Sequence, residues 1–102
     1  MKHVIKIDPI LGTKKLLKYE YDGTYKNDKK EGHGVFKWPS DGIYEGAFKE
    51  DFRHGFGIMR WADGTIYEGE WECGVQCGRG KLMIPDGTLK IGIFKDNILI
   101  DE

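Results

Sequence analysis

The side chains that could act as a nucleophile or a general base are few in this sequence and stand apart from one another. Ser40 is the only serine, and it lies within Pro-Ser-Asp-Gly, a run typical of a turn. His33 and His54 each stand beside a glycine, and we expect both at the surface or at a sheet edge. Catalysis needs such groups within reach of a base and an orienting residue. We therefore expect a protein without enzymatic activity.

Two thiols are the other reactive groups. Cys73 and Cys77 are the only cysteines and are four residues apart. A structural zinc site takes four ligands, so this single pair does not predict a metal site. We expect two free thiols, no metal and no cofactor. Free thiols without a recognisable signal peptide indicate a reducing, cytoplasmic location.

Gly-x-Gly segments occur at residues 32–34, 55–57 and 78–80, and nucleotide-binding loops contain similar segments. A dinucleotide fingerprint needs a third glycine and a following helix, which these segments lack. Gly80-Lys81 also lacks the upstream glycine of a phosphate-binding loop, because position 75 is valine. The glycines therefore call for a structural explanation.

That explanation is a repeat with a period of 23 residues. Three positions carry recurring aromatic or glycine residues: Tyr21, Tyr44 and Tyr67; Gly23, Gly46, Gly69 and Gly92; and Tyr25, Phe48, Trp71 and Phe94. An Asp-Gly pair closes each unit, displaced by one residue in the first. The period divides the chain into a non-repeat segment, 1–20, and a repeat array, 21–102. The array comprises full repeats 21–43, 44–66 and 67–89 and a partial repeat, 90–102.

Each repeat has the pattern of a β-hairpin, because large or small apolar residues alternate with polar ones on both sides of a short turn. Three of the turn pairs tolerate positive φ, whereas Glu50-Asp51 suits a two-residue turn less well. Counting outward from the turn predicts these pairs: Phe48 with Arg53, Gly46 with Gly55, and Tyr44 with Gly57. The repeating rings and glycines then share one face, where glycine leaves room for a ring to lie on the backbone.

The rest of the chain limits the function classes. The chain has 102 residues and a net charge of −1, which argues against nucleic-acid binding. Residues 1–37 carry nine lysines and five acids, and residues 38–102 carry seven basic and twelve acidic residues, so the two halves differ in sign. This asymmetry could orient docking or end-to-end assembly. Residues 11–19 fit either a helix or a further strand.

Several segments resemble the MORN repeat (membrane occupation and recognition nexus). They are Tyr-Glu-Gly-Ala-Phe at 44–48, Arg-His-Gly-Phe-Gly at 53–57, Asp-Gly at 63–64 and Tyr-Glu-Gly-Glu-Trp at 67–71. The resemblance covers residues 21–89 and part of 90–96. It implies an all-β fold, an elongated, single-layer, twisted antiparallel meander of hairpins with a grooved aromatic face. It also implies a scaffold at membranes or the cytoskeleton that pairs end to end or binds a helix in the groove.

A single-layer sheet leaves an aromatic strip that a second layer would otherwise cover, and such strips often mark interaction sites. We therefore expect a scaffold that binds a helix or an extended segment of a protein partner. The expected contact residues are Tyr25, Trp38, Phe48, Phe52, Trp61 and Trp71. The same rings could instead form the core of the repeats.

The alternative is a peripheral membrane module in which a lysine-rich end meets anionic lipid. Its contact residues would be Lys14, Lys15, Lys18, Lys26, Lys29 and Lys30.

Overall fold

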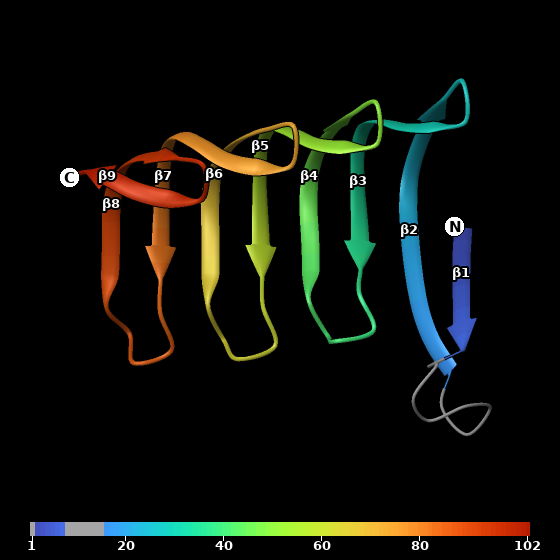
Figure 1. The fold of residues 1–102 in the computed structure, drawn as a ribbon, viewed down its shortest axis with the longest axis horizontal. Coiled ribbons are helices and arrows are strands. Elements are labelled where there is room, and N and C mark those ends of the chain that lie inside the picture. The colour runs from blue at the N-terminus through green and yellow to red at the C-terminus, as the bar shows by residue number, and fades with distance from the viewer. Residues whose placement is uncertain (1, 8–15) are drawn as a thin grey trace.

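The computed structural model describes residues 2–7 and 16–102, in which nine strands form one antiparallel sheet. The strands follow one another in chain order, as Figure 1 shows, so each pairs with its neighbours in the sequence. They are β1 (Lys2–Ile7), β2 (Leu16–Lys26), β3 (Lys29–Lys37), β4 (Ile43–Lys49), β5 (Phe52–Arg60), β6 (Ile66–Glu72), β7 (Val75–Met83), β8 (Leu89–Lys95) and β9 (Ile98–Asp101). The expected all-β hairpin meander is confirmed. Nowhere in the described ranges is there a helix long and apolar enough to cross a membrane.

The hairpins of the array are closed by two-residue turns in which both central residues have positive φ. This is the type I′ geometry, whose twist matches that of the paired strands. The φ angles are 52° and 65° at Asn27-Asp28, 49° and 84° at Cys73-Gly74, and 50° and 68° at Asp96-Asn97. Glu50-Asp51 forms the same turn, with angles of 49° and 73°. This pair therefore adopts the turn although its residue types suit it less well.

A β-bulge displaces the pairing within each hairpin. Phe48 pairs with Arg53 as expected, but the register then shifts, so that Gly46 pairs with Gly57 and Tyr44 with Met59. The expected pairs Gly46–Gly55 and Tyr44–Gly57 are therefore wrong. The bulge lies at Gly55, whose φ is 77°, and the equivalent glycines Gly32 and Gly78 have φ angles of 81° and 74°. The first glycine of each Gly-x-Gly segment thus supplies a backbone conformation that a side chain would strain.

The second glycine lies beneath a tyrosine ring. A Cβ atom added to Gly57 would lie 2.5 Å from Cε1 of Tyr44, and one added to Gly80 would lie 2.6 Å from Cε1 of Tyr67. Each ring is also held by its hydroxyl, which donates a hydrogen bond to a carbonyl three residues later. These bonds run from Tyr21 to Thr24 (2.8 Å), Tyr44 to Ala47 (2.8 Å) and Tyr67 to Glu70 (2.9 Å). Glycine therefore makes room for the ring, as the sequence predicts.

The core is a continuous row of these rings on one face of the sheet. Edge-to-face contacts connect successive rings: Tyr21–Phe48 (5.3 Å between centroids), Phe48–Tyr44 (5.0 Å), Tyr44–Trp71 (5.5 Å), Trp71–Tyr67 (5.1 Å) and Tyr67–Phe94 (5.0 Å). Met59 is buried among them. Aromatic pairs favour this geometry because the positive edge of one ring faces the negative face of another. Tyr21, Tyr44 and Tyr67 each contact a ring of their own hairpin and a ring of the next, so the core joins the repeats.

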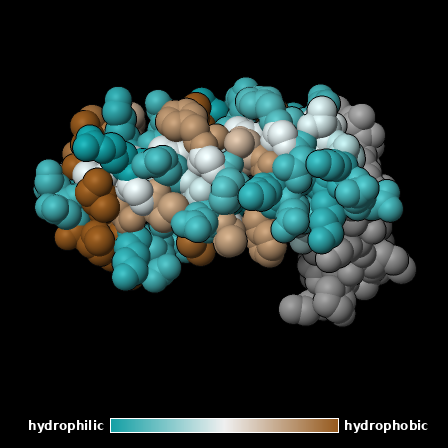
Figure 2. All heavy atoms as spheres, turned by 90° about the horizontal axis from the view of Figure 1, so that it is seen from above, coloured by the Kyte–Doolittle hydropathy of each residue, from teal (hydrophilic) through white to brown (hydrophobic). Residues whose placement is uncertain are grey.

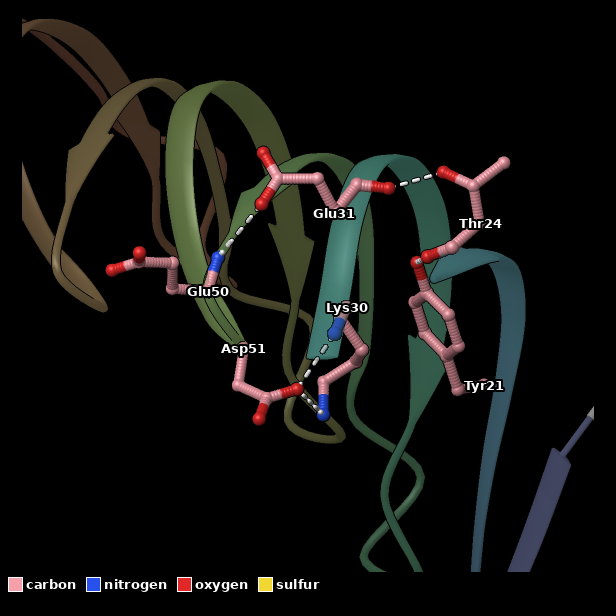
Figure 3. A network of polar contacts seen from close by, with 6 residues as sticks. All are labelled: Tyr21, Thr24, Lys30, Glu31, Glu50 and Asp51. Carbon is pink, nitrogen blue, oxygen red and sulfur yellow. Dashed lines mark hydrogen bonds and ion pairs between the residues drawn. The ribbon is translucent and has the colours of Figure 1, made fainter. Parts of the chain in front are cut away.

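Hydrogen bonds between hairpin turns add a second link. The Asp51 N–H donates to the Lys30 carbonyl (3.0 Å), and the Asp51 carboxylate accepts from both the backbone N–H (2.7 Å) and Nζ (3.3 Å) of Lys30. Figure 3 shows the two bonds to the Asp51 carboxylate together with the bond from the Glu50 N–H to the Glu31 carboxylate (3.3 Å). The backbone bond recurs in the later repeats, from Gly74 to Arg53 (3.0 Å) and from Asn97 to Gln76 (3.2 Å). Each turn is therefore fixed to the hairpin before it.

At the ends of the strands opposite the hairpin turns, short loops join β3 to β4, β5 to β6 and β7 to β8 and contain the Asp-Gly pairs. Gly64 and Gly87 have φ angles of 98° and 92°, and Asp41 takes the equivalent conformation in the first repeat, with φ of 69°. The one-residue displacement of the first Asp-Gly pair thus leaves the loop geometry unchanged. These loops lie along the lower edge of the sheet in Figure 1.

The N-terminal segment extends the sheet. β1 pairs with β2 from Lys2 opposite Tyr21 to Ile7 opposite Leu16. Within residues 11–19, the part from Leu16 onward is strand, and residues 8–15 lie outside the described ranges. The face opposite the core is partly apolar, with Phe56, Leu89 and Ile91 each more than half exposed. Figure 2, which looks along the sheet, shows apolar side chains gathering at the C-terminal end while polar ones cover much of the rest.

Candidate partner-binding groove

Three adjoining hollows form one groove along the aromatic face. The first, of about 220 Å³, lies near Tyr25 and β2, and it shares Lys30, Phe36 and Asp51 with the second, of about 200 Å³. The second shares Trp38 and Arg53 with the third, an open hollow of about 770 Å³ that extends toward Asn97. The groove therefore spans several repeats, a length suited to a segment of another chain.

Trp38 and Trp61 line the largest hollow with Met59 and Leu82. Both tryptophans follow the last residue of a core strand, at equivalent positions 23 residues apart, and both are partly buried against the core. Trp38 also packs on Phe36, with ring centroids 4.6 Å apart. Both side chains remain partly exposed and border the hollow.

Phe48 and Trp71 occupy a different environment. Only 5% of Phe48 and 3% of Trp71 is exposed, and both belong to the row of core rings. The Trp71 indole N–H also donates to the Gly57 carbonyl (3.2 Å). Phe48 borders the middle hollow, whereas Trp71 lies beneath the groove and supports it. For these two rings the structure favours the core role that the sequence left open.

Tyr25 and Phe52 lie toward the turns. Tyr25 is 41% exposed, borders the first hollow and contacts the Tyr21 ring edge-on at 5.0 Å. Phe52 is 53% exposed and borders the middle hollow. The structure thus places Tyr25, Phe48, Phe52, Trp38 and Trp61 along one groove, and Trp71 below it.

Arg53 is a groove residue that the sequence reasoning missed. Its guanidinium lies 4.6 Å from the Trp71 ring centroid and 5.7 Å from that of Trp38, and it donates one hydrogen bond to the Gly74 carbonyl (2.8 Å). Burial lowers the pKa of this guanidinium below its usual value, and nearby Tyr44 acts in the opposite direction. No carboxylate of the described residues forms an ion pair with it. Arg53 is thus a partly desolvated cation without a counter-ion among the residues that the structure describes.

Gln76 and Arg53 both neighbour Trp71. Gln76 of β7 is the strand partner of Trp71 in β6, and the Arg53 guanidinium lies over the Trp71 ring. Only 6% of Gln76 is exposed, and it lines the same hollow as Arg53. Its backbone N–H donates to the Asn97 side-chain oxygen (2.8 Å), but its side-chain amide forms no hydrogen bond with any residue in the described ranges. No buried side-chain nitrogen or oxygen of the described residues lacks a hydrogen-bond partner, so the polar atoms of this amide reach the solvent in the hollow.

The repeat itself contains the signal that identifies these residues. Lys30, Arg53, Gln76 and Leu99 occupy the same position in successive hairpins. The positions that build the core keep aromatic residues and glycine, whereas this one changes from cationic to neutral to apolar. Lys30, Arg53 and Gln76 line the groove, whereas Leu99 packs against the core.

The lysines considered for lipid contact differ in their surroundings. Lys14 and Lys15 lie outside the described residues. Lys18 pairs with Glu20 (2.9 Å), and Lys30 pairs with Asp51 (3.3 Å) while lying over the rings of Tyr21 and Phe36. Lys26 and Lys29 are exposed.

Other reactive groups show no catalytic arrangement in the part of the chain that the structure describes. The thiols of Cys73 and Cys77 are free, and burial raises the pKa of Cys77, which makes it a poorer nucleophile. No group of three or more His, Cys, Asp or Glu side chains in the described ranges is placed to hold a metal ion.

Comparison with known proteins bears on the repeats. A family model described as MORN repeat matches residues 21–43, 44–66 and 67–89. The comparison with curated proteins found no match.

Proposed function

Because this chain belongs to the MORN-repeat family, we propose that it is a non-catalytic scaffold that holds a helix or an extended segment of a protein partner in its aromatic groove. MORN repeats are generally modules for interaction with proteins or membranes, and they occur in membrane-associated and cytoskeletal proteins. A cytoplasmic location at one of these structures is part of the proposal, and the free thiols Cys73 and Cys77 are consistent with it.

The observation that supports the proposal is the open hollow of about 770 Å³ bordered by Trp38 and Trp61. Its apolar wall leads into the smaller hollows near Phe52 and Tyr25, so a partner could contact several repeats at once. Tryptophan is among the residues that most often dominate binding energy at interfaces, because it buries a large area on a rigid ring.

Affinity capture from an extract of the source cells tests this proposal. We expect the Trp38→Ala/Trp61→Ala variant to lose a partner that the wild type retains, with a loss of about 2 kcal/mol or more of binding free energy for each dominant ring. Each variant is first checked for a cooperative melting transition.

A matched control removes exposed apolar surface from the opposite face through Phe56→Ala/Ile91→Ala, two residues that are 57% and 53% exposed. The control should retain the partner. Equal capture by the wild type and a folded tryptophan variant would refute a role for the groove. Unfolding of the tryptophan variant would instead assign both rings to the core.

Two alternatives have less support. Membrane binding through the lysine-rich end is weakened by the ion pairs of Lys18 and Lys30, which occupy two of the proposed contacts. Sedimentation with vesicles containing anionic lipid, at low and high salt, tests it directly. End-to-end homodimerisation would use β1 or β9, the two edge strands of the sheet, and light scattering over a range of concentrations tests it.

A further inference from the structure

Arg53 has no counter-ion in the next turn because that turn has a glycine where the preceding one has an aspartate. In the preceding repeat, the Asp51 carboxylate accepts a hydrogen bond from Lys30 Nζ (3.3 Å) and balances its charge. The position equivalent to Asp51 in the following turn is Gly74, which offers Arg53 only a backbone carbonyl (2.8 Å). The array thus supplies a counter-ion to Lys30 and leaves Arg53 without one.

The groups around Arg53 are suited to an anion from outside the chain. A guanidinium has five N–H donors in a planar fork that matches a carboxylate, and only one bond from Arg53 is made within the described residues. The Gln76 amide adds further N–H donors on the same hollow. The guanidinium lies beside the rings of Trp38 and Trp71 and is partly desolvated, which strengthens its attraction to a negative group.

We propose that the partner segment in the groove carries an Asp or Glu side chain that binds Arg53 and Gln76 while neighbouring apolar side chains pack on Trp38 and Trp61. This inference rests on the groove function proposed above and adds the chemistry of the partner. A wholly apolar segment would bury the Arg53 charge without a partner, which is unfavourable.

A carboxylate within the segment fits better than one at a chain end. The groove continues on both sides of Arg53, toward Tyr25 in one direction and toward Asn97 in the other. A segment that passes over Arg53 fills both parts, whereas a chain end at Arg53 would leave one part empty.

The probe is a library of random 16-residue peptides displayed on phage. Peptides are selected on the wild-type chain after removal of those that bind Trp38→Ala/Trp61→Ala. The selected sequences are then synthesised with both ends blocked, so that only side chains carry charge. We expect them to share an acidic residue beside large apolar residues. Replacing that Glu by Gln, or that Asp by Asn, should weaken binding to the wild type about tenfold or more, the usual contribution of a charge-assisted hydrogen bond.

Two variants of Gly74 test the role of Arg53 without removing it. A Cβ at Gly74 would lie 3.8 Å from a terminal nitrogen of Arg53 and 3.5 Å from the Phe52 ring, both ordinary contact distances. Asp51 and Asn97 already adopt positive φ at the equivalent position, so either residue type is accommodated there. Gly74→Asp should supply the missing counter-ion and weaken binding of the acidic peptides about tenfold, whereas the neutral Gly74→Asn should have a much smaller effect.

The outcomes separate the two proposals. Peptides that depend on the tryptophans but not on a carboxylate would refute the acidic partner and leave the groove function intact. Equal effects of Gly74→Asp and Gly74→Asn would refute the role of Arg53. A selection that yields no tryptophan-dependent peptide would refute both proposals. The peptide substitution is measured on the wild type, so this test holds even if a Gly74 variant fails to fold.

Discussion

The substitution Gly80→Ala tests whether the tyrosine rings lie on glycine by steric necessity. The added Cβ would lie 2.6 Å from both Cε1 and Cζ of Tyr67. Ordinary contact begins at 3.4 Å, so the ring would have to retreat by about 0.8 Å. Trp71 and Phe94 pack edge-to-face against Tyr67 with centroids 5.1 and 5.0 Å away, and none of the ring is exposed to solvent. The ring therefore has no free space into which to move.

The size of the effect follows from two limits. If the surrounding side chains shift and the ring stays, overpacking costs typically about 1–3 kcal/mol. If the ring is expelled, the loss approaches that of deleting a buried aromatic side chain, about 3–5 kcal/mol. Alanine also restricts the unfolded chain and recovers about 0.4–1 kcal/mol. We expect a net loss of about 2–4 kcal/mol in the free energy of unfolding, measured by urea denaturation with tryptophan fluorescence.

Gly42→Ala is the matched control. The nearest atom to a Cβ at Gly42 is the flexible methyl end of Met59, at 3.3 Å, so we expect a change within about 1 kcal/mol. In a Tyr67→Ala background, Gly80→Ala should lose most of its effect, because the clashing ring is absent. Equal stability of Gly80→Ala and Gly42→Ala would refute the steric argument, as would a penalty that persists without the ring.

Two further predictions concern charge. Asp51→Ala should destabilise the array by about 1 kcal/mol, because the Lys30 N–H loses its acceptor, whereas Asp51→Asn should cost less, since Asn97 makes the equivalent bond to Gln76. The hydrogen bonds from Lys30 lower the pKa of Asp51, so the wild type should lose this stabilisation as the pH falls through the folded-state pKa, and Asp51→Asn should not. Burial raises the pKa of both Tyr44 and Tyr67 from 10.0 to about 12. Between pH 10 and 12 both phenols stay protonated in the folded state, whereas the tyrosines of the unfolded chain ionise. The stabilisation from these two groups should therefore be complete below pH 10 and be lost as the pH rises toward 12, with a smaller loss in Tyr44→Phe. Urea midpoints measured at several alkaline pH values check this prediction, and midpoints that do not change with pH would contradict it.

Much of the fold was predictable because its determinants recur every 23 residues. The period identifies the hairpins, and the placement of aromatic residues identifies the core face. The strand register could not be obtained in the same way. Gly55 and Gly57 are the same residue type in the sequence, yet one supplies a positive φ at a bulge and the other makes room for a ring. Nothing local distinguishes these roles, so the bulge and the two-residue shift at Gly46 escaped prediction.

The turn at Glu50-Asp51 shows a related limit. Residue preference argues against type I′ geometry at this pair, but the paired strands β4 and β5 fix the twist that the turn must match. The Asp51 carboxylate then gains two bonds from Lys30 in the preceding hairpin. Because that stabilisation comes from the neighbouring repeat, the four residues of the turn do not reveal it.

The candidate site was predicted in part for a similar reason. Trp38 and Trp61 are recognisable as apolar residues at equivalent positions of a one-layer sheet. Arg53 is not, because its importance depends on three other residues. Trp38 and Trp71 partly desolvate it, and Gly74 has no side-chain carboxylate of the kind that the equivalent Asp51 provides for Lys30. An unpaired cation is a property of an arrangement in space, so an inventory of charged residues does not detect it.

The groove therefore has a direction, although the repeats that build it are alike. At one repeat position the side chain changes from a lysine paired with Asp51 to an arginine without an ion pair in the described residues, and then to an amide, all of which line the groove. The last side chain at this position is Leu99, which packs against the core. We expect this row of side chains to help orient the proposed partner segment, because its carboxylate would bind at Arg53. Specificity for one orientation can thus arise from a single repeat position while the aromatic and glycine positions continue to maintain the sheet.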